Sequence, residues 1–218
     1  YAASENGTAK GGAIYNYSGT IGNITGDFIG NYAASENGTA QGGAIFNDGG
    51  TITIAGASTF TDNYVEKNGG KTSNAIHNNG DYGKDAIINF NSGNIVINDG
   101  ITGENYKDWN HHIHKSIFNF AGQQTTTSDN DVITLNNSLT NSDTTKGNIE
   151  VNLAKGTLKL GHYKSEKFGD SHGTLGEGVD FNVSGGKLTT QDGITDDHNL
   201  GNLKLSADLN TSIDVNLN

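Results

Sequence analysis

The chain has 218 residues, including 32 glycines but no cysteine, proline or methionine, and only 17% of its residues are charged. Its formal net charge is −11, and every basic residue is lysine. The lack of cysteine excludes disulfides and thiolate metal sites, and the acidic balance argues against nucleic acid or an anionic membrane as a partner.

The N-terminal part of the chain is dominated by a repeat. Residues 1–16 read YAASENGTAKGGAIYN and residues 32–47 read YAASENGTAQGGAIFN. A weaker third copy follows at the same spacing, around Ala75 and Ile76. Repetition at a fixed period of this size indicates a repeat architecture. The two strong copies differ only at Lys10/Gln41 and Tyr15/Phe46.

Each copy contains three short apolar runs bounded by glycine, asparagine and aspartate. In the first copy they lie at 11–16, 19–21 and 27–32. Such runs are typical of strands, and no helical spacing separates them. The pattern therefore predicts an all-β, single-stranded parallel β-helix (β-solenoid) with three short strands per coil. Successive coils of such a fold stack about 4.8 Å apart.

Stacking places equivalent residues of successive copies over one another. We expect an inner column of isoleucines beside alanines, glycine pairs at a corner, phenylalanines at a second corner, and asparagines bonded in an amide ladder. Packing is the expected role of all of them, rather than ligand binding. These predicted repeat residues are Gly11, Gly12, Ala13, Ile14, Asn16, Phe28, Asn31, Gly42, Gly43, Ala44, Ile45, Asn47, Phe60, Asn63, Ala75, Ile76 and Asn78.

Residues 1–10, 32–41 and 64–72 are expected to be loops that project from one edge of successive coils. They carry Glu5, Glu36 and Glu66, and a row of acidic loops on a rigid scaffold could form a binding rim. The alternative is that they are duplicated spacers without a ligand.

The second half of the chain has alternating strand patterns with longer interruptions. Loop excursions are expected near 104–110, which holds the single tryptophan, and near 122–130 and 161–178. No linker separates the halves. The expected organisation is therefore one continuous β-helix over 1–218, part of a longer protein, with repeat-type coils at 1–103 and diverged coils at 104–218.

The ordered alternation of two tetrapeptides resembles a known family. Gly-Gly-Ala-Ile at 11–14 and 42–45 alternates with Phe-x-x-Asn at 28–31 and 60–63. This is similar to bacterial autotransporter passenger domains, above all those of the chlamydial polymorphic membrane proteins and related gut-bacterial autotransporters. The third copy departs from the pattern, because Ser73-Asn74 replaces the glycine pair.

The resemblance implies a right-handed coil exported through a C-terminal β-barrel translocator of the full-length protein. It also implies a cell-surface or secreted location and a non-enzymatic role as a stiff spacer and adhesin. The implied partner is a ligand on a host or neighbouring cell. No stretch of about 18 apolar residues is present, so this segment is not expected to insert into a membrane.

The histidine run at 111–114 is the best candidate for a metal site. On a strand, His112 and His114 share one face. Closed zinc sites need four ligands, so Asp108 or His77 would have to complete the set. A solvated strand face is the simpler interpretation, and no metal is expected.

Catalysis would require a positioned carboxylate pair. Asp196-Asp197, and Asp27 with Asp62, are the candidates, but adjacent strand residues face opposite ways. No nucleophile elbow or phosphate-binding loop is present. The sequence therefore predicts neither enzymatic activity nor a cofactor. The alternatives left open are a polysaccharide-acting β-helix enzyme and a phage or fibre-type structural protein.

Overall fold

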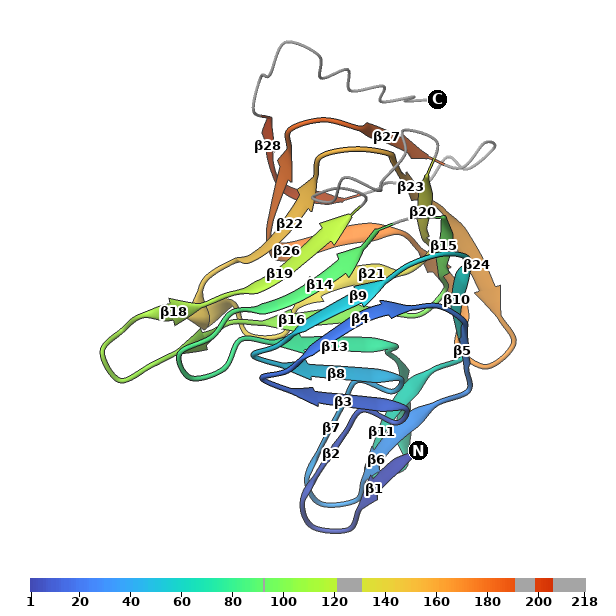
Figure 1. The fold of residues 1–218 in the computed structure, drawn as a ribbon. Helices are drawn as coiled ribbons and strands as arrows, with labels where there is room; N and C mark the ends of the chain where they lie inside the picture. The colour runs from blue at the N-terminus through green and yellow to red at the C-terminus, as the bar shows by residue number, and fades with distance from the viewer. Residues whose placement is uncertain (92, 121–130, 191–198, 206–218) are drawn as a thin grey trace.

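The computed structural model describes residues 1–91, 93–120, 131–190 and 199–205, and these residues form an all-β structure of stacked parallel strands (Figure 1). Three stacks, here called wall A, wall B and wall C, each receive one strand from successive stretches of the chain. This arrangement is compatible with the predicted β-solenoid. No helix in the described part of the chain has the length and apolarity needed to cross a bilayer.

The walls are made of short strands in parallel register. Wall A contains β3 (Ile14–Tyr17), β8 (Ile45–Asp48), β13 (Ile76–Asn79), β16 (Ile101–Glu104) and β21 (Ser138–Asn141). Wall B contains β4 (Thr20–Ile24), β9 (Thr51–Ile54), β14 (Ala86–Phe90), β19 (Ser116–Phe120) and β22 (Ile149–Leu153). Wall C contains β5 (Asp27–Ile29), β10 (Ser58–Thr61), β15 (Asn94–Ile97), β20 (Val132–Leu135), β23 (Thr157–Leu160) and β27 (Lys187–Thr190).

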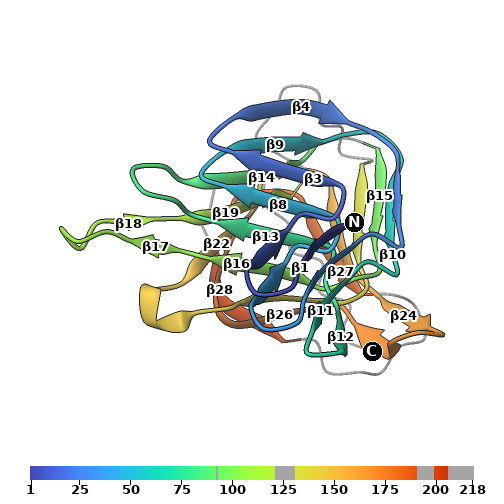
Figure 2. The same cartoon turned by 90° about the horizontal axis from the view of Figure 1, so that it is seen from below.

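Walls A and B merge near the C-terminal end of the described chain. The long strand β26 (Thr174–Val183) pairs with β21 through its start and with β22 through its end. The last strand, β28 (Leu200–Leu205), follows β26 in parallel. Gly178, with a φ of +73°, lies between the two halves of β26. The result is one sheet of twelve strands that runs along wall A and returns along wall B (Figure 2).

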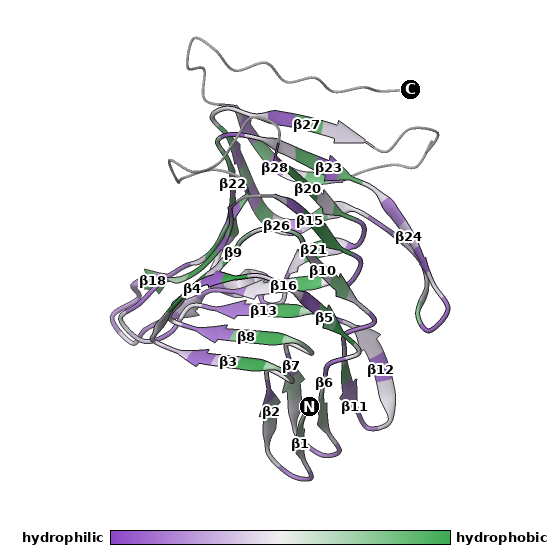
Figure 3. Cartoon of the chain, turned by 45° about the vertical axis from the view of Figure 1, so that its right-hand side comes forward, coloured by the Kyte–Doolittle hydropathy of each residue, from purple (hydrophilic) through white to green (hydrophobic). Residues whose placement is uncertain are grey.

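The predicted isoleucine column is confirmed. Ile14, Ile45 and Ile76 are direct register partners, and the last two are fully buried. In Figure 3 the hydrophobic parts of β3, β8 and β13 lie one above another. The column continues beyond the recognisable repeat, through Ile101, Leu139, Leu175 and Leu200.

The paired phenylalanines stack as expected, but not at a corner. The rings of Phe28 and Phe60 are parallel, with centroids 4.7 Å apart. Both residues lie within strands of wall C and point into the core. The prediction of a corner position was wrong because the turn follows two residues later, at Gly30, which has a φ of +65°.

The glycine pairs make the corner before wall A, as predicted. Gly11 and Gly42 have φ values of 61° and 62°, a left-handed conformation that favours glycine. A Cβ on Gly12 would lie 2.1 Å from the carbonyl oxygen of Gly43 in the next coil. The first glycine therefore makes the turn, and the second allows the close approach of two backbones.

The predicted amide ladder is also present. Asn16 Nδ2 donates to Asn47 Oδ1, and Asn47 Nδ2 donates to Asn78 Oδ1, both at 2.8 Å. The ladder then stops because Gly103 is the next residue in register. Asn78 Nδ2 bonds instead to Ser116 Oγ at 3.0 Å. Each amide therefore has a partner, as buried polar groups require.

A second ladder, which was not predicted, lies on wall B on the side opposite the core. In each step the side-chain Nδ2 of one asparagine donates to the side-chain Oδ1 of the previous asparagine in the stack. The donor and acceptor pairs are Asn119 to Asn89 at 2.8 Å, Asn152 to Asn119 at 3.0 Å, and Asn182 to Asn152 at 3.0 Å. It extends the ladder principle to coils in which the sequence repeat is no longer recognisable.

The Phe-x-x-Asn asparagines form a third, shorter ladder. Asn31 Nδ2 donates to Asn63 Oδ1 at 3.0 Å, and Asn63 Nδ2 donates to Asp99 Oδ2 at 2.7 Å. Ser73 Oγ, in the third copy, donates to the other oxygen of Asp99 at 3.2 Å. Burial raises the pKa of Asp99, although the hydrogen bonds from Asn63 oppose the shift. The third copy thus replaces the glycine corner with a polar contact.

Two of the predicted loop excursions contain hairpins. Residues 104–110 include β17 (Tyr106–Lys107), which pairs with β18 (Ile113–His114). Residues 161–178 contain β24 (His162–Ser165), β25 (Gly169–His172) and the start of β26. The loop predicted at 122–130 lies outside the described residues. A short 3-10 helix, η1 (Thr144–Lys146), precedes β22.

The β24–β25 hairpin reaches back to a much earlier coil. Ser165 Oγ donates to Asp62 Oδ1 at 3.0 Å, although the two residues are 103 positions apart. Lys167 Nζ lies 3.7 Å from the centroid of the Tyr64 ring. Coils of a solenoid normally contact only their neighbours, so this hairpin links coils that stacking alone would leave independent.

We expect Ile45→Ala to lower the free energy of unfolding by about 2–5 kcal/mol, because it opens a cavity in the fully buried column. The matched control is Ile29→Ala, since Ile29 is 64% exposed; its effect should stay within about 0.5 kcal/mol. Urea denaturation followed by circular dichroism measures both. Equal effects of the two substitutions would contradict the assigned register.

We also expect removal of the β24–β25 hairpin to make unfolding less cooperative. Gly173 N donates to Gly161 O at 2.8 Å, so residues 162–172 can be replaced by a two-residue turn. Urea curves followed by circular dichroism and by the fluorescence of Trp109, the single tryptophan, should coincide in the parent and separate in the variant. Coincident curves in the variant would show that the hairpin does not couple the coils.

Candidate functional site

The three predicted edge loops are strands that together form a groove. Residues 1–10 contain β1 (Ala2–Ser4) and β2 (Thr8–Lys10), and 32–41 contain β6 (Tyr32–Ser35) and β7 (Thr39–Gln41). Residues 64–72 contain β11 (Tyr64–Lys67) and most of β12 (Gly70–Ser73). The loop prediction was wrong because small residues of consecutive copies pair in register, as Ala2 does with Ala33. The sheet β1-β6-β11-β12 projects beyond the walls (Figure 1).

Serine side chains hold the tight turns of this sheet in both copies. Gly7 N donates to Ser4 Oγ at 2.9 Å, and Gly38 N donates to Ser35 Oγ at 3.0 Å. Ser35 Oγ also donates to Gly7 O at 2.8 Å, which joins the two turns. Short polar side chains favour such local bonds, so the repeated Ser-Glu-Asn-Gly sequence makes the same turn twice.

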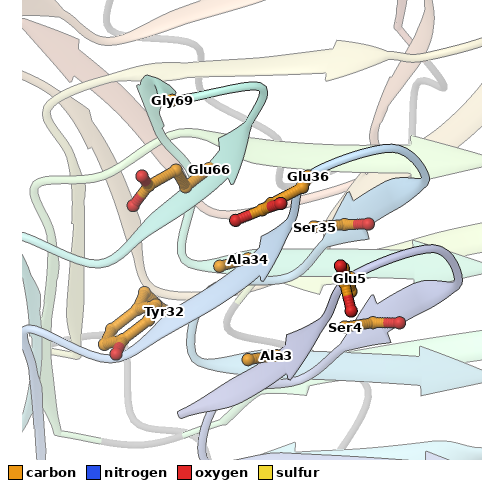
Figure 4. Close-up of a pocket in the computed structure, with 9 residues that line it drawn as sticks. All are labelled: Ala3, Ser4, Glu5, Tyr32, Ala34, Ser35, Glu36, Glu66 and Gly69. Atoms are coloured by element: carbon orange, nitrogen blue, oxygen red, sulfur yellow. The ribbon is translucent and has the colours of Figure 1, made fainter.

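The open groove beside these turns has a volume of about 560 Å³ (Figure 4). The predicted acidic rim is brought together here, because Glu5, Glu36 and Glu66 all line it. Glu66 is balanced by Lys71, with Nζ 3.8 Å from its carboxylate. Glu5 comes directly after β1 and Glu36 directly after β6, the neighbouring strand of the sheet. Both are exposed, and neither has an ion pair in the described part of the chain. The groove therefore suits a ligand with positive charge or hydrogen-bond donors.

A stack of tyrosines runs through the same sheet. Tyr1 and Tyr32 have ring centroids 5.1 Å apart at an interplanar angle of 5°, and Tyr32 and Tyr64 lie 5.1 Å apart at 11°. The backbone register of β6 and β11 places Tyr64 beside Tyr32. The stack stiffens the groove, because each ring fixes the position of its neighbour.

The only two positions that differ between the strong copies meet on the outer face of wall A. Lys10 Nζ lies 4.3 Å from the centroid of the Phe46 ring and 3.2 Å from Asp48 Oδ2. Gln41 Nε2 lies 3.3 Å from His77 Nε2 in the next coil. The residue at the first variable position therefore contacts the aromatic ring of the next coil in both copies: Lys10 lies over Phe46, and Gln41 lies beside His77. These contacts were not predicted, but the paired differences were visible in the sequence.

His77 is buried in this outer cluster and is not available to complete a metal site with the histidine run. Its Nδ1 lies 2.7 Å from Thr102 Oγ1, and its ring stacks on Phe46 at 5.1 Å. Burial lowers the pKa of His77 to about 4, which outweighs the opposing charge of Glu104. Glu104 is bonded to Lys146 and lies 3.9 Å from the imidazole. The histidine is therefore neutral at pH 7.

The histidine run lies on the projecting β17–β18 hairpin (Figure 2). His112 Nδ1 lies 3.2 Å from Asp108 Oδ2, and His114 Nε2 lies 3.8 Å from the same oxygen. Burial acts to raise the pKa of Asp108, but hydrogen bonds from His112 and from the Asn110 backbone together outweigh it and lower the pKa. No group of three His, Cys, Asp or Glu side chains among the described residues could hold a metal ion.

Exposed aromatic rings gather beside this hairpin. Trp109, 75% exposed, donates its indole N–H to Tyr82 Oη at 3.2 Å. Tyr82 packs edge-on against Tyr106, with ring centroids 6.3 Å apart. Two separate connections between walls A and B therefore contribute rings to one patch.

Of the two carboxylate pairs weighed for catalysis, only Asp27 with Asp62 lies within the described residues. Asp27 pairs in register with Thr59, so Asp62 lies three residues further along the chain. Asp62 instead accepts a hydrogen bond from Ser165 of the β24–β25 hairpin. Asp196 and Asp197 lie outside the described residues.

Comparison with known proteins found no match to this chain among family models, curated proteins or solved structures.

We expect His77→Phe, which restores the residue of the preceding copy, to flatten the pH dependence of stability. A histidine with a folded pKa near 4 and an ordinary unfolded pKa of 6.5 binds its proton more strongly in the unfolded chain. Its stability contribution is therefore complete above pH 6.5 and is lost as pH falls towards 4. The slope approaches about 1.4 kcal/mol per pH unit.

Urea titrations between pH 4.5 and 7 measure this dependence in the parent and the variant. His112→Phe is the matched control, because the His112 side chain is 72% exposed. A His77→Phe slope equal to that of the parent would contradict a buried, neutral His77.

Proposed function

We propose that this chain is a non-enzymatic, right-handed single-stranded β-helix with three strands per coil, acting as a stiff spacer that carries adhesive surfaces. The parallel strand register supports the coil arrangement, and parallel crossover connections are right-handed in about 98% of known cases. The proposal places the protein on a bacterial cell surface or among secreted proteins. The repeat resemblance to autotransporter passengers supports that location.

The observation that carries the spacer role is the unbroken inner column. Five successive register partners in this column have fully buried side chains: Ile45, Ile76, Ile101, Leu139 and Leu175. Asparagine ladders run beside it on two walls. A rod in which every coil is fixed to its neighbour by core contacts and side-chain bonds holds its length, as a spacer requires.

The adhesive role is assigned to the acidic groove on the β1-β6-β11-β12 sheet. Its carboxylates are held by rigid strands and serine-fixed turns rather than by flexible loops. Preorganised groups lose less entropy on binding. The fitting partner is a cell-surface or matrix molecule with positive charge, which Glu5 and Glu36 attract.

We expect the double substitution Glu5→Gln with Glu36→Gln to lower binding to host or matrix surfaces about tenfold or more at low salt, because it removes both unpaired carboxylates of the groove. The matched control is Glu166→Gln with Glu177→Gln, which makes the same charge change at exposed positions that do not line the groove. Binding of labelled protein to cells and matrix-coated surfaces is the measurement.

Equal loss of binding in both variants would show that the effect comes from net charge and would contradict the groove assignment.

Incubation with neutral and acidic polysaccharides tests the enzyme alternative in parallel. Reproducible release of new reducing ends would overturn the non-enzymatic role. A stable trimer in light scattering would favour a fibre-type structural protein.

A further inference from the structure

The sequence contains four Asn-Gly pairs, all within the described residues, and they differ in how firmly each is held. They begin at Asn6, Asn37, Asn68 and Asn79. An asparagine before glycine is open to an intramolecular reaction, because glycine has no side chain to shield its backbone nitrogen from the asparagine amide carbon. Asparagine is accordingly one of the thermolabile residues. The contacts of each pair therefore decide which one reacts.

The pair Asn79-Gly80 is held most firmly. Asn79 Nδ2 donates to Asp48 Oδ1 at 2.8 Å, and Gly80 N donates to Glu104 O at 2.8 Å. A Cβ on Gly80 would lie 2.1 Å from the carbonyl oxygen of His114, so neighbouring backbone crowds this position. The Asn79 amide carbon and the Gly80 nitrogen cannot approach each other without breaking these contacts.

The pairs in the two repeat turns are held at the glycine nitrogen. Gly7 N and Gly38 N each donate to the Oγ of the serine three residues earlier, at 2.9 Å and 3.0 Å. Asn37 Nδ2 also donates to Asn6 Oδ1 at 3.0 Å, which links the two side chains. A nitrogen whose N–H is already bonded must lose that bond before it can attack.

The pair Asn68-Gly69 forms the tip of the β11–β12 hairpin and lacks such contacts. Asn68 and Gly69 have φ values of 51° and 77°, and Lys67 pairs with Gly70 across them, as in the type I′ turn that Asn-Gly favours. Both residues are exposed, and Figure 4 shows Gly69 at the turn. Within the described part of the chain, neither the Asn68 side chain nor Gly69 N has a hydrogen-bond partner. A Cβ on Gly69 would meet only open space.

We propose that Asn68 is a site of spontaneous deamidation. The Gly69 nitrogen loses its proton to solvent and attacks Cγ of Asn68. The new N–Cγ bond closes a succinimide ring, and the side-chain nitrogen leaves as ammonia with the proton returned from solvent. Water then opens the ring. Addition at Cγ gives aspartate, whereas addition at the backbone carbonyl gives isoaspartate, in which the main chain runs through Cβ.

Either product places a new carboxylate beside the acidic groove. Gly69 lines that groove, and Glu66 on the same hairpin is balanced by Lys71. Asp-Gly also favours a type I′ turn, so the aspartate product keeps the hairpin. The isoaspartate product lengthens the turn by one main-chain atom and strains the pairing of Lys67 with Gly70. If the added charge is to strengthen attraction for a positively charged partner, that consequence rests on the proposed adhesive function.

Peptide mapping by mass spectrometry tests the site in the whole chain, because deamidation raises the mass of a peptide by about one dalton. Cleavage after lysine separates the four pairs, through Lys10, Lys67 and Lys71. After incubation at pH 8 and 37 °C, Asn68 should convert about tenfold or more faster than Asn37 or Asn79, since those pairs must open first. The matched control is the chain unfolded in urea, in which all four pairs should convert at similar rates.

Conversion at Asn79 as fast as at Asn68 in the folded chain would overturn the proposal. An unconverted Asn68 in the folded chain, after the unfolded chain has reacted, would equally overturn it. Binding of Asn68→Asp to matrix-coated surfaces at low salt separates this result from the proposed function. Ranked conversion with stronger binding than the parent supports both, whereas ranked conversion with unchanged binding supports the site and contradicts the adhesive role of the groove.

Discussion

The spacing of about 4.8 Å between parallel strands is the constraint on which this structure depends. At that distance each side chain lies directly over its equivalent in the next coil, so the stacked groups must tolerate close contact with their own kind. Aliphatic side chains, aromatic rings and amides satisfy this condition, and Ile45, Phe60 and Asn47 are examples. Carboxylates satisfy it less readily, because like charges in register repel. Glu150 and Asp180 are register partners, and each is paired with a lysine, Lys115 and Lys204 respectively.

Charged groups accordingly pair with opposite charges or lie outside the core. Lys10 and Asp48 pair between coils, and Glu104 bonds to Lys146 where η1 interrupts the coil. Asp99 ends a ladder, because its carboxylate accepts hydrogen bonds from Asn63 and Ser73 but has no N–H group that could donate to a further residue. Glu5 and Glu36 stand on turns beyond the strands, where solvent screens them. The acidic groove and the buried outer cluster both lie outside the apolar core between the walls.

Residue spacing was sufficient to predict the interior of the first coils. The isoleucine column, the Asn16–Asn47–Asn78 ladder and the glycine corner followed from the period alone. Strands in the edge segments were not foreseen, because Ser-Glu-Asn-Gly indicates a turn and only pairing between copies extends the flanking alanines. The wall B ladder was missed because Asn89, Asn119 and Asn152 recur at unequal spacings of 30 and 33 residues, although each stands between two apolar residues. The contact from Ser165 to Asp62 depends on tertiary folding that no local pattern encodes.

The coil-to-coil register is the central claim, and engineered disulfides test it directly because the chain has no cysteine. Asp27→Cys with Thr59→Cys joins register partners, and adjacent strands place Cα atoms within the range of about 4.4–6.8 Å that a disulfide spans. Asp27→Cys with Thr61→Cys is displaced by two residues on the same strand face. Mass spectrometry after mild oxidation should show complete cross-linking of the first pair and little of the second. Equal cross-linking of both pairs, or preference for the second, would contradict the stacked register.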